Sequence, residues 1–111
     1  MDAWNAGDRE AWLGLHTVDA EHVTLAGDDP EVYRGREGLC EVWDRSAVNW
    51  ERFEFAIVGD PVAPVVEVEF AGVERLGGSR LDGTLWLRVA VRDGCITRLW
   101  TALDPSLLAG V

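Results

Sequence analysis

Two glutamates stand two residues apart in an apolar run, and their spacing could support acid–base chemistry. The run from residue 65 to 70 reads V-V-E-V-E-F, so Glu67 and Glu69 share one face if it forms a strand. Two carboxylates enclosed by apolar side chains would have at least one raised pKa. Such a carboxyl group can act as a general acid or base near neutral pH.

The direction in which these two glutamates point has two alternatives. In one register they face outward beside Arg88 and Arg98 and form cross-strand charge pairs, while the neighbouring valines fill the interior. In a register shifted by one residue, Glu67 and Glu69 face the interior instead. The amino-acid composition of the run favours the outward register.

Other residue types with chemical potential are sparse. His16 ends an apolar helical stripe that includes Trp12, and it could serve as a polar helper to a catalytic group, as could Tyr33. His16 and His22 have no clear third partner, so we expect no metal site. The glycine-rich loop 76–79 is not followed by a helix, which argues against a nucleotide site and leaves no expected cofactor.

The pattern of the chain predicts helices first and then a sheet. Asp8 is a good N-cap for a helix over 9–16, and apolar spacing predicts a helix over 36–47. Residues 18–21 read as a turn, and 27–30 as a loop. Asp93-Gly94 between two apolar runs is a strong hairpin signal. Strands are predicted over 22–26, 31–34, 50–58, 65–73, 80–92 and 96–103, which makes the fold class α+β.

Composition excludes several classes of function. The 111 residues are 48% apolar and 27% charged, which predicts one globular domain spanning 1–111. The net charge is −10 and every basic residue is arginine, which argues against nucleic acid and anionic membrane surfaces as partners. Cys40 lies on an apolar helix face and Cys95 in no disulfide-rich pattern, so both are expected as free thiols. We expect no leader and no membrane span, and therefore a cytoplasmic protein.

Several short motifs resemble the SnoaL-like branch of the nuclear-transport-factor-2-like (NTF2-like) superfamily. They occur in family order over nearly the whole chain, whereas the long first helix of the family is represented only by its last turn. The motifs are W-N-A-G-D at 4–8, V-Y-R-G-R-E-G-L at 32–39, V-R-D-G-C-I-T-R-L at 91–99 and L-D at 103–104. The resemblance implies a cone-shaped α+β fold, with a curved, mainly antiparallel sheet wrapped on two or three helices around a pocket.

The resemblance also allows known catalytic sets to be compared with this sequence. The tyrosine and two aspartates of ketosteroid isomerases would fall before Met1, near Thr24 or Leu25, and at Leu87, so that set is absent. The epoxide-hydrolase-like set would need an aspartate where Thr101 stands. Its arginine and second aspartate would fall at Glu67 and Glu69, and this family spacing favours the register in which both glutamates face inward.

The resemblance further assigns faces to the last two strands. It places Leu87, Leu99 and Thr101 inside the cone, where Trp12, Tyr33 and Trp43 would complete a ligand-binding lining for an apolar small molecule. The outer face would then carry an apolar patch suited to a homodimer interface. That patch comprises Trp86, Arg88, Arg98 and Trp100.

Two functions from different classes fit these features. One is a proton-transfer enzyme (isomerase, cyclase or dehydratase) acting on an apolar carbonyl compound, with Glu67 or Glu69 as base and His16 as helper. The other is a non-catalytic ligand-binding or dimerisation module. The side-chain direction of the two glutamates distinguishes these hypotheses.

Overall fold

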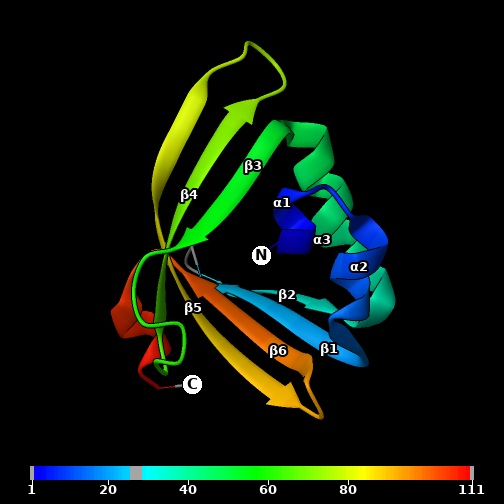
Figure 1. Cartoon of the computed structure of the whole chain (residues 1–111), viewed down its shortest axis with the longest axis vertical. Coiled ribbons are helices and arrows are strands. Elements are labelled where there is room, and N and C mark those ends of the chain that lie inside the picture. The colour runs from blue at the N-terminus through cyan, green and yellow to red at the C-terminus, as the bar shows by residue number, and fades with distance from the viewer. Residues whose placement is uncertain (1, 26–28, 111) are drawn as a thin grey trace.

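A computed structural model describes residues 2–25 and 29–110 of the chain, in which three α-helices lie on one side of a strongly curved sheet (Figure 1). This arrangement confirms the expected α+β cone. The helices are α1 (Asp2–Asn5), α2 (Arg9–Gly14) and α3 (Gly35–Asn49), and a 3-10 helix, η1 (Pro105–Leu108), follows the sheet. The strands are β1 (His16–Leu25), β2 (Glu31–Arg34), β3 (Trp50–Ile57), β4 (Val66–Glu74), β5 (Arg80–Arg92) and β6 (Cys95–Ala102).

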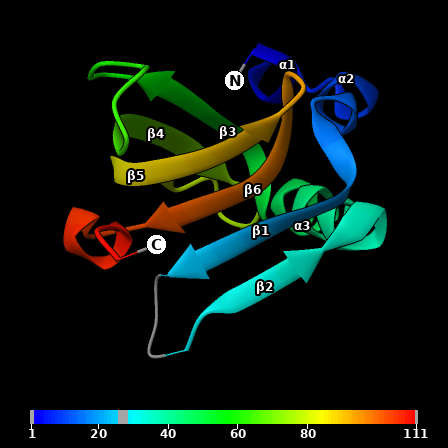
Figure 2. The same ribbon diagram turned by 90° about the horizontal axis from the view of Figure 1, so that it is seen from below.

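The six strands form one sheet in the order β2-β1-β6-β5-β4-β3. Neighbouring strands are antiparallel except for β1 and β6, which run side by side in the same direction (Figure 2). The β5–β6 hairpin has the expected two-residue turn, with φ of 53° at Asp93 and 80° at Gly94. Positive φ at both central residues defines a type I′ turn, which matches the twist of the flanking strands.

The start of the chain is fixed to the sheet edge by side-chain hydrogen bonds. Asn5 donates to the Phe55 carbonyl at 2.8 Å and accepts from the Phe55 amide at 2.9 Å, so its side chain pairs with strand β3 as a neighbouring strand would. Trp4 donates from Nε1 to the Phe53 carbonyl at 2.9 Å. Asp8 caps α2 as predicted, because its Oδ1 accepts from the Ala11 amide.

Three tryptophans join the helices into one core. The ring centroids of Trp4, Trp12 and Trp43 lie 5.1 to 5.4 Å apart, one from each of α1, α2 and α3. Trp4 packs edge-to-face against both other rings, an arrangement that suits the charge distribution of aromatic rings, and Trp12 and Trp43 are tilted relative to each other. The fully buried Leu39 of α3 packs in the same cluster. The cluster sets the position of α2, whose end leads directly into strand β1.

The predicted turn at 18–21 is wrong, because these residues belong to strand β1. The pairing of β1 with β6 shifts between His16 and Glu21, so that β1 contains a bulge of extra residues. Val18 lies on the bulge and is exposed, while Ala20 is fully buried. The helix predicted over 9–16 ends earlier, at Gly14, because strand β1 already begins at His16. The predicted strand over 22–26 ends at Ala26, and the predicted loop begins with Gly27 and Asp28; these three residues lie outside the described residues.

The register of β4 is the outward one for both glutamates. Val66 pairs with Leu87 and Val68 with Leu85 on the inner face, whereas Glu67 pairs with Trp86 and Glu69 with Thr84 on the outer face. Val68 is fully buried, and both glutamates are exposed. Burying the valines instead of the carboxylates avoids the cost of removing two charges from water.

Gly72 provides a first test of the packing on this inner face. A Cβ at this position would lie 2.8 Å from ring atoms of Phe53 and Trp50. We therefore expect Gly72→Ala to lower the free energy of unfolding by roughly 1 to 2 kcal/mol through overpacking. Urea denaturation measures this change. Gly14→Ala is the control, since a Cβ there meets no atom within 4 Å; an equal loss in both variants would contradict the packing explanation.

In the part of the chain that the structure describes, no helix is both long and apolar enough to cross a membrane.

Candidate functional site

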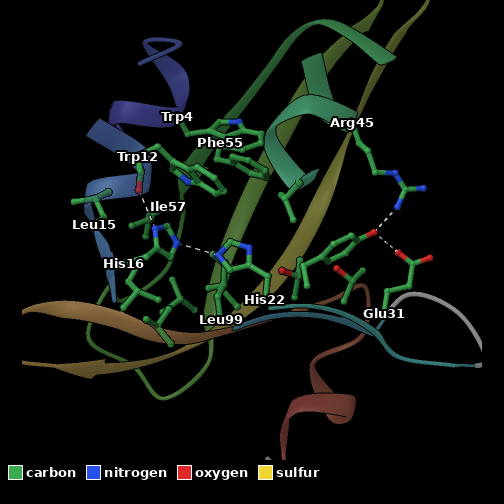
Figure 3. A pocket seen from close by; sticks show the side chains of 18 of the residues that line it. Trp4, Trp12, Leu15, His16, His22, Glu31, Arg45, Phe55, Ile57 and Leu99 are labelled. Atoms are coloured by element: carbon green, nitrogen blue, oxygen red, sulfur yellow. Dashed lines mark hydrogen bonds between the residues drawn. The ribbon is translucent and has the colours of Figure 1, made fainter. Parts of the chain in front are cut away.

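A cavity of about 530 Å³ lies between the inner face of the sheet and the helices (Figure 3). This volume is within the range of about 300 to 1,000 Å³ that is typical of small-molecule sites. Its walls are mainly apolar and aromatic. The lining residues are Trp4, Trp12, Leu15, His16, His22, Thr24, Glu31, Tyr33, Val42, Arg45, Asn49, Phe55, Ile57, Pro61, Val66, Leu87, Val89, Ile96, Leu99 and Thr101.

Strand pairing arranges the floor of this cavity in two rows that cross the sheet. One row runs from Tyr33 on β2 through His22 on β1 to Leu99 on β6 and Val89 on β5. The parallel row runs from Glu31 through Thr24 and Thr101 to Leu87. Both rows are polar on β2 and β1 and apolar on β5. A ligand in the cavity therefore meets polar groups at one end and hydrocarbon at the other.

Two histidines form a hydrogen-bonded pair at the polar side of the cavity. Nε2 of His16 lies 3.0 Å from Nε2 of His22, and Nδ1 of His16 lies 2.8 Å from the Trp12 carbonyl oxygen (Figure 3). His16 and His22 are both buried residues, and the Trp12 ring packs edge-on against both imidazoles, with centroids at 4.9 and 5.6 Å. We call His16 and His22 the histidine pair.

These contacts define which nitrogen carries a proton in the neutral pair. A carbonyl oxygen only accepts, so His16 donates from Nδ1 to Trp12 and its Nε2 has a lone pair. His22 must then donate from Nε2 to His16. Nδ1 of His22 is left with a lone pair and has no partner among the described residues. Figure 3 shows this second ring nitrogen facing the cavity below Phe55.

Burial keeps the histidine pair neutral at pH 7. Removal from water and, to a smaller extent, the neighbouring His16 together lower the pKa of His22 from 6.5 to about 4. Burial also lowers the pKa of His16, although its bond to the Trp12 carbonyl opposes this shift. The cavity therefore presents an unprotonated imidazole nitrogen over the whole physiological pH range.

A second polar group lies where β2 meets α3. Tyr33 donates from its hydroxyl to Oε2 of Glu31 at 2.9 Å and accepts a short hydrogen bond from Nη1 of Arg45 (Figure 3). Burial and the bond to Glu31 raise the pKa of Tyr33, so the phenol stays protonated. We call Glu31, Tyr33 and Arg45 the polar triad.

Most of the residues predicted to line a pocket do line this cavity. They are Trp12, His16, Tyr33, Leu87, Leu99 and Thr101. Trp43 does not, because its ring is packed behind the cavity wall against Trp4 and Trp12. What any of these residues binds stays a prediction.

Glu67 and Glu69 do not belong to the cavity, which corrects their interpretation as its acid–base pair. Their side chains are on the opposite face of the sheet, where Glu69 borders a shallow depression with Glu54 and Asp82. Neither forms the expected ion pair with Arg88 or Arg98 in the described structure. Arg98 instead donates to Glu21 at 2.6 Å.

Sequence reasoning missed His22, Thr24 and Arg45 as site residues. The alternation of the strand from residue 22 put Val23 and Leu25 on one face, which left His22 and Thr24 together on the other. That polar face, followed by Tyr33 on the next strand, was the available signal. Nothing in the sequence marks Arg45, which lies on the solvated side of its helix pattern.

The described residues contain no group of three or more His, Cys, Asp or Glu side chains that could hold a metal ion. Cys40 and Cys95 are free thiols in the structure.

The curved sheet closing over helices is the NTF2-like, ketosteroid isomerase-like fold, and solved structures share it. TerC co-crystallised with polyporic acid matches with a TM-score of 0.73 and 18% identity over 98% of this chain and 88% of that one. A proposed polyketide cyclase from Xanthomonas campestris pv. campestris matches at 0.67 and 22%, over 98% and 87%. A protein of ketosteroid isomerase-like fold from Catenulispora acidiphila, bound to trimethylamine, matches at 0.69 and 19%, over 89% and 77%.

The family can be stated more narrowly than the fold. A model of the SnoaL-like domain matches residues 1–99, so the chain belongs to the SnoaL-like family. A search of curated protein sequences finds no significant match.

Proposed function

We propose that this protein is a proton-transfer enzyme of the isomerase or cyclase kind, acting on an apolar compound that carries a carbonyl group. The observation that supports this most directly is the histidine pair. It places an unprotonated nitrogen of His22 at the wall of an apolar cavity and fixes the ring through His16. A positioned base with a free lone pair is the basic requirement for removing a proton from carbon.

The proton path follows from the hydrogen bonds. A substrate carbon beside the carbonyl gives its proton to Nδ1 of His22, and the electron pair of the C–H bond moves to form an enolate. His22 becomes an imidazolium whose Nε2–H still donates to His16. Return of the proton to another carbon completes an isomerisation. Attack of the enolate carbon on a second carbonyl instead forms a ring and an alkoxide, and the imidazolium of His22 then gives its proton to the alkoxide oxygen.

The developing enolate oxygen needs hydrogen-bond donors. Thr24 and Thr101 are paired across β1 and β6, and both line the cavity beside His22. Their hydroxyl groups can donate to an oxygen placed between them. Charge on this oxygen would also favour the imidazolium form of His22 by raising its pKa during the reaction.

The experiment that tests this function measures exchange of α-protons in deuterium oxide. The protein is incubated with a panel of cyclic and aromatic ketones, and the loss of the α-proton NMR signal is followed. Exchange faster than in buffer supports the enzyme. Compounds that bind without any accelerated exchange contradict it and favour the alternative, a non-catalytic ligand-binding module.

We also propose a homodimer through the outer face of β5 and β6. Trp86, Arg88 and Trp100 are half-buried there, and Arg98 stacks over Trp100 with its Cζ 5.5 Å from the ring centroid. The outer face of β3 to β5 carries Glu54, Glu67, Glu69 and Asp82 instead. Mutual repulsion of these carboxylates would restrict contact between two copies to the tryptophan half.

Replacing Trp100 by glutamate is expected to halve the mass measured by light scattering, because a charge would be buried in the interface. Leu76→Glu is the control, since Leu76 is 90% exposed in the loop between β4 and β5. An unaltered protein that is monomeric would rule out this interface.

A further inference from the structure

We infer that the polar triad is an anion-recognition site, and that the ligand of this cavity is a cyclic apolar compound bearing one acidic group such as a carboxylate or sulfonate. This inference deepens the proposed function, since it concerns the same cavity, but it depends on binding alone. It rests on three observations: the pairing state of Arg45, the fixed position of Tyr33, and the distribution of polarity across the cavity floor.

Arg45 has N–H donors that form no hydrogen bond with a described residue. Six other arginines of the described residues form ion pairs with carboxylates: Arg9, Arg34, Arg36, Arg52, Arg92 and Arg98. Arg45 forms none with a described residue, and one of its five N–H groups is used on Tyr33. Among the described residues that line the cavity, Arg45 is the one arginine. An acceptor oxygen of a ligand therefore finds a guanidinium whose charge is not already neutralised by direct pairing.

Tyr33 fixes this guanidinium at the rim of the cavity, where Arg45 is exposed to solvent. The tyrosine hydroxyl is oriented by its bond to Glu31, so its lone pair is directed at Arg45. The Arg45 guanidinium also lies over the Tyr33 ring, with Cζ 5.9 Å from the centroid. A long arginine side chain held at both its planar face and its edge loses less freedom on binding an anion.

The position of the triad relative to the histidine pair limits the size of the ligand. Tyr33 pairs directly with His22, and Glu31 pairs with Thr24. Neighbouring antiparallel strands are about 5 Å apart, and Arg45 is bound at the hydroxyl end of the Tyr33 side chain, so the anion site and the base are separated by at least the length of the tyrosine ring. The opposite end of the floor is Leu87, Val89 and Leu99, which suits further hydrocarbon.

Glu31 allows a second test of the inference, with an expected effect of the opposite sign. Its carboxylate lies in the cavity wall, is exposed to solvent, and accepts a hydrogen bond from the Tyr33 hydroxyl. Its negative charge repels an anion bound at Arg45. Glutamine at this position would still accept the tyrosine hydrogen bond but would lack the charge. Removing the two charges in turn should therefore change anion binding in opposite directions.

The test uses two fluorescent probes with the same aromatic skeleton: anilinonaphthalene sulfonate, which is an anion, and N-phenylnaphthylamine, which is neutral. We expect Arg45→Gln to weaken binding of the sulfonate by about tenfold and Glu31→Gln to strengthen it by about two- to threefold. Binding of the neutral probe should change less than about twofold in both variants. Arg80→Gln, which removes an exposed arginine of strand β5 that does not line the cavity, is the matched control and should alter binding of neither probe.

Several outcomes would overturn the inference. One is unchanged sulfonate binding in Arg45→Gln, and another is an equal loss of both probes, which would mean that Arg45 only shapes the cavity. Leu99→Trp and Thr101→Phe fill the cavity from below, and sulfonate binding that survives both in folded protein would place the site elsewhere. The two proposals can fail separately. Binding of the sulfonate without any α-proton exchange of ketones contradicts the enzyme. Faster α-proton exchange of neutral ketones than of ketones with an acidic group contradicts the anion site.

Discussion

We expect the His22→Gln variant to catalyse α-proton exchange about 100- to 10,000-fold more slowly than the unaltered protein, which is the usual contribution of a general base. Glutamine keeps a polar side chain of similar length and can still donate to His16, but it has no nitrogen lone pair that accepts a proton. The loss should appear in kcat, with little change in KM, because the base acts on the transition state and contributes little to binding.

The low pKa of His22 does not prevent this role. A base with a pKa of about 4 is weak, yet a carboxylate of pKa about 4.6 removes the substrate proton in ketosteroid isomerase. At pH 7 the whole population of His22 is unprotonated and ready to accept, since its pKa is lowered to about 4. Donors at the enolate oxygen, here Thr24 and Thr101, would supply the remaining stabilisation.

The control variants for this experiment come from the outer face of the sheet. Glu67→Gln and Glu69→Gln should leave kcat within about twofold, because neither carboxylate reaches the cavity. His16→Gln should cost about tenfold, since glutamine can still accept from His22 but holds its ring less rigidly. A His22→Gln variant with unchanged kcat would remove this residue from the mechanism.

The second large effect is a loss of stability in acid. His22 in the unfolded chain binds a proton near pH 6.5, whereas in the folded protein it binds one only near pH 4. Between these values the unfolded state takes up more protons, so the free energy of unfolding falls as the pH falls through this window. Each unit of pKa difference corresponds to about 1.4 kcal/mol, which makes the expected loss about 3 kcal/mol.

Urea denaturation at a series of pH values measures this loss, and His22→Phe serves as the comparison. Phenylalanine fills a similar volume and does not titrate, so the extra dependence between pH 6.5 and 4 should disappear. The lowered pKa values of His16, Glu21 and Asp104 also weaken stability in acid. The shift of His16 is caused by burial and opposed by backbone hydrogen bonds, without a contribution from His22, so all three effects are common to both proteins and cancel in the difference. Parallel stability curves for the two proteins would show that burial of His22 has no such cost.

Local patterns were sufficient to predict most of the fold. The Asp93-Gly94 turn, the cap at Asp8 and the helical spacing around Trp43 each depend on residues close in sequence, and the structure confirms them. Strand β1 was harder, because the polar segment from Val18 to Glu21 has the composition of a turn. Only its pairing with β6, far along the chain, makes it a bulged strand.

The candidate site could be predicted only in part. The residues lining the cavity followed from strand alternation and the family resemblance, but a shift of one residue reverses every side chain of a strand. Composition and family spacing disagreed on Glu67 and Glu69, and only their pairing with Trp86 and Thr84 decides between them. The contact between His16 and His22 depends on the bulge that separates them, which no local pattern specifies.

The parallel pairing of β1 with β6 has a consequence for the order of folding. His22 pairs with Leu99, and Thr24 with Thr101, across more than two-thirds of the chain. Closing so long a loop costs chain entropy before any contact compensates for it, and such contacts slow folding. The β3–β4 and β5–β6 hairpins can form locally, but the floor of the cavity is assembled only when the first and last strands meet. Binding of a ligand therefore indicates that the first and last strands have paired. A chain shortened before β6 would lack the site altogether.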